Sequence, residues 1–120
     1  MKVESRKPYD LEERTFQFAK KVALFCQNLK KTITNYEYAR QLIRSSGSVG
    51  ANYIEANEAL GKRDFVMKIK TCRKESKESA YWIRLILGTN GEEPKQEASA
   101  LMNEAVELKK IFSAIVEKTM

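Results

Sequence analysis

Four basic residues in the second half of the chain form the pattern best suited to chemistry, namely the binding of phosphate groups. They are Lys70, Arg73, Lys77 and Arg84. At about 100° per residue, their side chains would project within about 60° of one another, along about 20 Å of a helix. Such a basic stripe can bind the backbone of a nucleic acid without reading its sequence. The alternative is a solvated helix face whose charge is offset by neighbouring carboxylates such as Glu75 and Glu78.

No catalytic or metal-binding constellation accompanies the basic stripe. The chain has no histidine, which removes the commonest general base and the usual zinc and di-iron ligand sets. The two cysteines, Cys26 and Cys72, form no CxxC pair and fall on apolar helix faces. They are therefore predicted to be buried, reduced thiols. We expect no enzymatic activity, no cofactor and no metal site.

The position of the chain in the cell can also be predicted from its composition. The first ten residues are polar and charged rather than a secretory signal, and no apolar run is long enough to span a bilayer. Together with the reduced thiols, these features predict a cytoplasmic protein that has no contact with a membrane. The net charge of +6 permits binding to a nucleic acid or to an acidic protein surface.

The basic stripe requires a helix, and hydrophobic periodicity predicts four helices, over about residues 10–31, 35–61, 62–87 and 92–118. Asp10 and Glu13 are spaced as a capping box at the start of the first helix. The links are short, so consecutive helices should run antiparallel. The predicted fold is therefore all-α: a single domain of residues 1–120 forming an up-down-up-down antiparallel four-helix bundle, with a basic tail over residues 1–9.

The second predicted helix contains the most unusual segment of the chain. Its glycines and serines are poor helix formers, but two rows of residues recur at helical spacing. The rows are Leu42, Ser46, Val49, Tyr53, Ala56 and Leu60, and Ala39, Ile43, Gly47, Gly50 and Ile54. We therefore predict a continuous central helix that neighbouring helices approach closely on two sides. Asn57 falls in the middle of its packing face, and a large residue in place of Gly47 or Gly50 should overpack it.

Two sets of residues lie away from the main core rows and are candidates for a contact between subunits. They are Ser45, Ser48, Asn52 and Glu55 on the second predicted helix, and Met67, Trp82 and Leu85 on the third. The alternative for the serine-rich segment is close packing within one subunit. The alternative for Asn52 and Glu55 is a solvated polar side. An apolar patch that faces away from a filled core more often marks a surface for a partner.

Several segments of the sequence resemble a known family. They are residues 43–56 (IRSSGSVGANYIEA), 62–65 (KRDF), 81–85 (YWIRL) and, at the start, 10–16 (DLEERTF). The chain resembles the four-helix-bundle proteins encoded by intervening sequences within bacterial 23S ribosomal RNA genes. The resemblance implies an up-down bundle and assembly into a homopentameric ring. The family is also similar in architecture to basic, pentameric accessory proteins of diversity-generating retroelements, which work with a reverse transcriptase and its RNA.

The residues and the resemblance together predict a non-enzymatic, homo-oligomeric scaffold or accessory protein, with a pentamer favoured. It would bind structured RNA or another nucleic acid through the basic stripe, or contact an RNA-associated protein. The rival hypothesis is a structural oligomer that binds a protein partner such as a reverse transcriptase, with no direct contact to nucleic acid. Mixing with non-specific RNA in a gel-shift experiment would separate the two.

Overall fold

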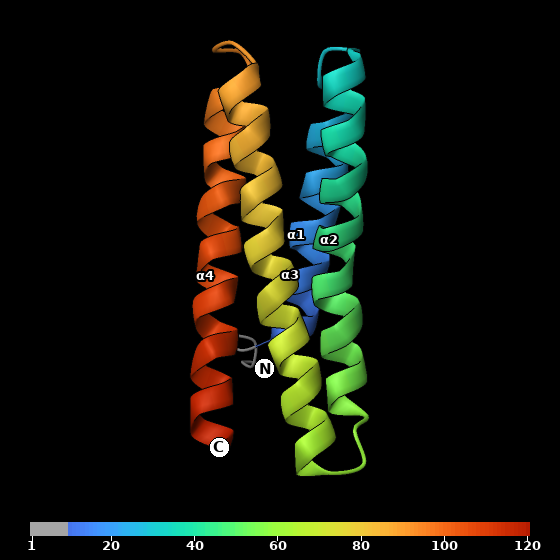
Figure 1. Ribbon diagram of the computed structural model, residues 1–120, viewed down its shortest axis with the longest axis vertical. Coiled ribbons are helices and arrows are strands. Elements are labelled where there is room, and N and C mark those ends of the chain that lie inside the picture. Colours follow the sequence, from blue (N-terminus) through green and yellow to red (C-terminus); the bar gives the residue numbers. More distant parts are fainter. Residues whose placement is uncertain (1–9) are drawn as a thin grey trace, which may run out of the picture.

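Residues 10–120 are described by a computed structural model, and four long helices account for almost all of them (Figure 1). The helices are α1 (Leu11–Gln27), α2 (Ile33–Asn57), α3 (Lys62–Thr89) and α4 (Lys95–Thr119). Each helix packs against two others, in the pairs α1–α2, α2–α3, α3–α4 and α1–α4. The α1–α2 and α3–α4 links lie at one end of the bundle and the α2–α3 link at the other. The predicted all-α, up-down-up-down bundle is confirmed, whereas the basic tail of residues 1–9 lies outside the described residues.

The ends of the helices are set by local hydrogen bonds. Asp10 caps α1, since its side chain accepts a hydrogen bond from the backbone N–H of Glu13 at 3.2 Å. The carboxylate of Glu13 accepts a hydrogen bond from the side-chain amide of Gln17 at 2.8 Å. α1 ends at Gln27, about four residues earlier than predicted. Thr32 caps α2 by accepting from the backbone N–H of Asn35 at 3.0 Å.

The glycine- and serine-rich segment is part of one uninterrupted helix, as predicted, and α2 is packed closely on two sides. On the α1 side, a Cβ atom added to Gly50 would lie 2.9 Å from the hydroxyl oxygen of Thr15. On the α3 side, the hydroxyl groups of Ser45 and Ser79 are hydrogen-bonded at 2.9 Å. Small side chains at these positions allow the three helices to approach one another.

Some residues that the sequence places on the packing face of α2 are exposed in the structure. Ile43, Gly47 and Ile54 are exposed, whereas Gly50 of the same row lies close to Thr15 of α1. Asn57 is exposed rather than central to the packing face. α2 stops there, so Leu60 leaves the helical register and is fully exposed in the link.

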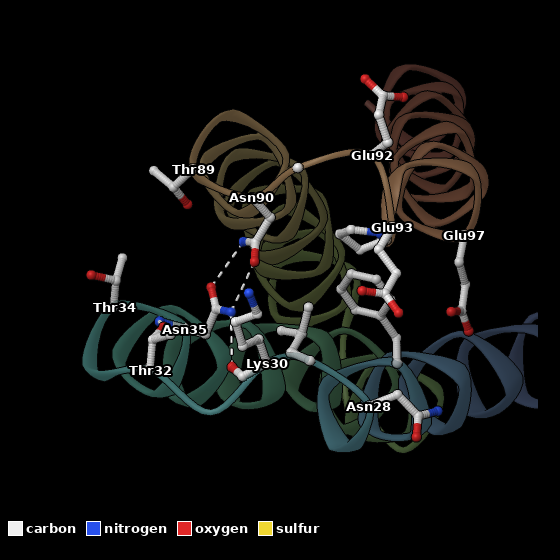
Figure 2. A pocket seen from close by; sticks show the side chains of 14 residues that line it. Asn28, Lys30, Thr32, Thr34, Asn35, Thr89, Asn90, Glu92, Glu93 and Glu97 are labelled. Carbon is white, nitrogen blue, oxygen red and sulfur yellow. Dashed lines mark hydrogen bonds between the residues drawn. The ribbon is translucent and has the colours of Figure 1, made fainter.

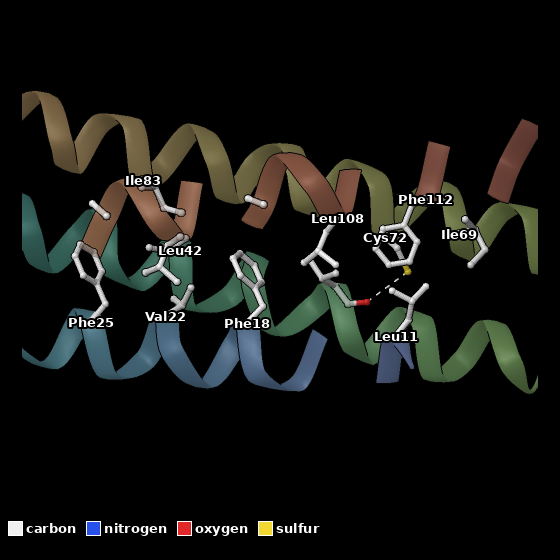
Figure 3. Close-up of a cluster of buried hydrophobic side chains, with 14 of the residues drawn as sticks. Leu11, Phe18, Val22, Phe25, Leu42, Ile69, Cys72, Ile83, Leu108 and Phe112 are labelled. Atoms are coloured by element: carbon white, nitrogen blue, oxygen red, sulfur yellow. Dashed lines mark hydrogen bonds between the residues drawn. The ribbon is translucent and has the colours of Figure 1, made fainter. Parts of the chain in front are cut away.

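The core runs the length of the bundle, and every helix contributes to it (Figure 3). The buried residues of α1 are Leu11, Thr15, Phe18, Val22 and Phe25. Phe16, on the same helix, is exposed. The largest fully buried side chains are Phe18, Phe25, Phe112, Leu42, Ile69, Ile83, Ile86 and Leu108. This continuous core fixes how each helix is rotated and therefore which of its residues face outward.

Candidate nucleic-acid interface

The basic stripe lies on α3, on the flank of that helix away from α2. Lys77 and Arg84 are exposed, and Lys70 and Arg73 are half-buried. The flank can be identified from contacts on the opposite side, where Lys68, Glu75 and Glu78 of α3 meet α2. Around the axis of α3, the residues of the stripe lie away from Lys68, Glu75 and Glu78 and nearer to the side on which α4 packs. The structure therefore places all four predicted residues on one helix face.

The two carboxylates that could have neutralised the basic stripe point to α2 instead. Glu78 accepts a hydrogen bond from the guanidinium group of Arg44 at 2.9 Å. Glu75 lies 3.6 Å from the same group and is only 6% exposed. One guanidinium group thus faces two carboxylates, and both are drawn into the seam between α2 and α3.

As a result, the four cations of the basic stripe remain unpaired within the described chain. No carboxylate of residues 10–120 lies within 4.0 Å of the charged atoms of Lys70, Arg73, Lys77 or Arg84. Such unpaired, accessible ammonium and guanidinium groups are the donors that bind phosphate oxygens.

The structure also extends the basic surface beyond the predicted stripe. Lys62 and Arg63, in the first turn of α3, lie with Lys70 around a shallow groove of about 590 Å³. The groove is lined in addition by the apolar side chains of Val66, Met67 and Met120. The sequence contains the KR pair at residues 62–63, but it does not reveal that the end of α4 is brought beside it. The basic surface therefore reaches from the first turn of α3 to Arg84.

The four candidate interface residues of α2 lie in different surroundings. Ser45 is completely buried against Ser79 of α3, so it packs within its own protomer and not at the surface. This corrects its predicted place in a contact between subunits, and the reason is the close approach of α2 and α3. Asn52 is half-buried and donates a hydrogen bond to the carbonyl oxygen of Ser48, also half-buried, at 2.8 Å. Glu55 pairs with Lys68 of α3 at 2.7 Å, and this hydrogen bond raises the pKa of Lys68.

The apolar candidates on α3 differ in exposure. Met67 is exposed at one end of the helix, whereas Leu85 is half-buried near the other. Trp82 is half-buried between two tyrosines, with ring centroids 6.0 Å from Tyr38 of α2 and 5.2 Å from Tyr81. Much of the Trp82 surface is therefore engaged within the protomer, and the outermost ring of this aromatic group belongs to Tyr81.

A second feature lies at the end of the bundle that carries the α1–α2 and α3–α4 links (Figure 2). The side-chain amides of Asn35 and Asn90 donate to each other, at 3.0 and 2.9 Å. They lie beside a cavity of about 720 Å³ whose lining includes Glu92, Glu93 and Glu97. This pairing joins the start of α2 to the end of α3 and was not predicted, because nothing in the sequence links two asparagines 55 residues apart.

The two cysteines differ in burial: Cys72 is buried, as predicted, whereas Cys26 is half-buried. Both are free, Cys72 is fully buried, and its thiol donates to the carbonyl oxygen of Val49 at 3.4 Å. Burial raises the pKa of Cys26 to about 11 and that of Cys72 to about 12. Both groups are therefore protonated and weakly nucleophilic near neutral pH. Within residues 10–120, no cluster of three or more potential ligands could hold a metal ion.

These features define a class of protein, an antiparallel four-helix bundle with an unpaired basic face on its third helix. Residues 8–114 match the family described as 23S rRNA-intervening sequence protein, and the chain belongs to this family. None of the helices between residues 10 and 120 combines the length and the hydropathy needed to cross a membrane.

The fold of this chain is similar to that of a solved structure. It is a protein of unknown function from the S23 ribosomal protein family of Bacteroides thetaiotaomicron VPI-5482. The TM-score is 0.77 at 24% sequence identity, over 88% of this chain and 97% of that chain. No curated protein matches the sequence.

Proposed function

We propose that this protein is a non-enzymatic, homo-oligomeric scaffold or accessory factor that binds structured RNA through the basic stripe of α3. One observation carries the proposal: Glu75 and Glu78 pair with Arg44, so the neighbouring cations have no carboxylate of the described chain beside them. Phosphate groups would supply the missing negative charge. Binding of this kind depends on charge spacing and not on base sequence.

Assembly would increase the affinity of each stripe by repeating it on one particle. The exposed apolar side chains of α1 and α2 support assembly, since Phe16, Ile43 and Ile54 are 56%, 47% and 50% exposed. Apolar side chains exposed together on one face of a protein often mark a surface for a partner. We assign the outer face of the α1–α2 pair to contact with a second copy. The resemblance noted for the sequence favours five copies.

The choice of α1 and α2 for this contact leaves the basic stripe accessible. α1 and α3 are not in contact and lie diagonally opposite in the bundle. In a ring, the α1–α2 face of one copy meets a different surface of its neighbour, and we place that second surface outside α3, so the phosphate-binding face stays accessible. The interface proposed from sequence for Met67, Trp82 and Leu85, in contrast, lies on α3 itself. The two proposals thus differ in which surface is available to RNA.

The proposal is tested by neutralising two exposed cations of the basic stripe. In the double variant Lys77→Gln/Arg84→Gln, affinity for a labelled RNA hairpin should fall by at least about tenfold at fixed low salt, measured by fluorescence anisotropy. The matched control is Lys20→Gln/Lys21→Gln, which removes the same charge from exposed positions of α1. The control should bind nearly as well as the wild type.

The same measurement separates this function from its rival. A scaffold that binds only a protein partner, such as a reverse transcriptase, would show no affinity for the hairpin. Equal weakening by the α1 and α3 variants would point to a diffuse charge effect and remove the basic stripe from the proposal. Circular dichroism of both variants would establish that the helices are intact.

A further inference from the structure

We infer that Tyr81 is a stacking platform for an unpaired base, so that the protein binds single-stranded segments of RNA in preference to duplex. This inference rests on the proposed function and specifies which form of RNA the basic stripe would take. It arises from an aromatic side chain that the phosphate-binding proposal leaves unused. Tyr81 is 55% exposed, although it belongs to an aromatic group with Tyr38 and Trp82.

Of the charged residues that neighbour Tyr81 on α3, Lys77 and Arg84 are cations, while the carboxylate of Glu78, three residues before it, is paired with Arg44 of α2. Lys77 precedes it by four residues and Arg84 follows it by three, so both are its neighbours on the helix surface. Both are exposed, and neither is paired with a carboxylate of residues 10–120. An aromatic ring between two unpaired cations is the arrangement in which successive phosphates bind the charges and the intervening base stacks on the ring.

Contacts with other aromatic side chains of the protein also hold the ring of Tyr81 in place. Its centroid lies 5.2 Å from that of Trp82, with the planes inclined at 69°, an edge-to-face contact. Trp82 in turn packs on Tyr38 of α2, with centroids 6.0 Å apart. This stack ties Tyr81 to two helices, so less side-chain freedom is lost when a base binds. Because more than half of the side chain is still exposed, a base has access to it.

Duplex RNA does not offer such a contact, because its bases are stacked within the helix. Unpaired loops and strands can turn a base outward onto an aromatic ring. The geometry around Tyr81 therefore favours loops, bulges and single strands, while the neighbouring cations remain indifferent to base sequence. A preference of this kind would direct the protein to the unpaired parts of a structured RNA.

The test compares three RNA probes with equal numbers of phosphates: an oligouridylate, a duplex and an abasic strand. The wild type should bind the oligouridylate best. Tyr81→Leu, which keeps apolar bulk over Trp82, should lose roughly 10- to 100-fold in affinity for the oligouridylate and little for the other two probes. Tyr81→Phe should bind like the wild type. The fluorescence of Trp82, the single tryptophan, should be quenched by the oligouridylate in the wild type but much less in Tyr81→Leu.

The outcomes distinguish this inference from the proposed function. If Tyr81→Leu binds the oligouridylate as tightly as the wild type, while Lys77→Gln/Arg84→Gln still weakens binding, stacking is overturned and phosphate binding stands. If the wild type binds none of the three probes at low salt, the proposed function fails and stacking fails with it. An unchanged circular dichroism spectrum and an unchanged particle mass in light scattering would show that Tyr81→Leu is folded and assembled. Loss of folding or assembly would then be excluded as the cause of weaker RNA binding.

Discussion

Gly47 and Gly50 are three residues apart on α2, but their surroundings are opposite. A Cβ atom at Gly47 would meet nothing within 4 Å. At Gly50 it would lie 2.9 Å from the hydroxyl oxygen and 3.3 Å from the Cβ atom of Thr15. Thr15 is buried and its hydroxyl donates to the carbonyl oxygen of Leu11 at 2.7 Å, so it has little room to move. Only Gly50 is therefore required for packing, and the expectation from sequence that both glycines are tightly packed is wrong for Gly47.

This difference predicts opposite effects of the same substitution. Gly47→Ala should stabilise the protein by up to about 1 kcal/mol, because alanine favours the helix and fits without contact. Gly50→Ala should destabilise it, since overpacking costs about 1–3 kcal/mol and outweighs the gain in helix propensity. Urea unfolding at one protein concentration measures both free energies. A Gly50→Ala variant as stable as Gly47→Ala would contradict the close α1–α2 approach.

The seam between α2 and α3 contains a buried carboxylate that depends on one arginine. Glu75 is only 6% exposed, and its Oε1 atom has no hydrogen-bond partner among the described residues. The nearest cation to this atom is the guanidinium group of Arg44, at 3.6 Å, while Lys74 is 4.0 Å from the other oxygen. A buried charge left without its counter-ion costs more than an exposed one. Arg44 should therefore stabilise the α2–α3 pair through Glu75.

Removal of this cation gives a test at the scale of the helix pair. Arg44→Ala should lower the free energy of unfolding by about 1–3 kcal/mol. Lys68→Ala, which breaks the exposed pair with Glu55, should have a much smaller effect, because solvent screens that pair. In a Glu75→Gln background the effect of Arg44→Ala should be much smaller, because no buried charge remains. An equal cost in both backgrounds, measured by urea unfolding, would show that Glu75 is not stabilised by Arg44.

The order and interior of the helices could be predicted from sequence, but the exact ends and the relative rotations could not. Leu60 continues the apolar spacing of α2, yet the helix ends at Asn57. Periodicity describes which side of a helix is apolar and carries little information on where the helix stops. The basic stripe was visible in the spacing of its charges. Whether Glu75 and Glu78 neutralise it depends on how α3 is rotated against α2, which no single helix reveals.

At the scale of the whole molecule, the proposed assembly concerns the outer face of α1 and α2. Closed rings need two different surfaces on each copy, so this face would meet another part of its neighbour. Ile43→Asp or Phe16→Asp should lower the mass of the particle in light scattering, because a charge would be buried in an apolar contact. Met67→Asp, at a similarly exposed position on α3, is the matched control and should leave the mass unchanged.

If Met67→Asp lowers the mass of the particle and the α1 and α2 variants do not, the contact between copies lies on α3, as the sequence first suggested. A wild-type protein with the mass of one protomer would remove the oligomer altogether. In that case the bundle would remain, and each particle would carry a single basic stripe. The affinity for RNA would then have to come from the few cations of one α3 helix and its neighbours.

The most direct test of the account is the salt dependence of RNA binding. The logarithm of the association constant for an oligouridylate should fall linearly with the logarithm of the salt concentration. Its slope should be less steep by about one unit per removed cation in Lys77→Gln/Arg84→Gln than in the wild type. The Lys20→Gln/Lys21→Gln control should keep the wild-type slope. Binding that is absent, or whose slope is the same in all three proteins, would contradict the assignment of phosphate binding to α3.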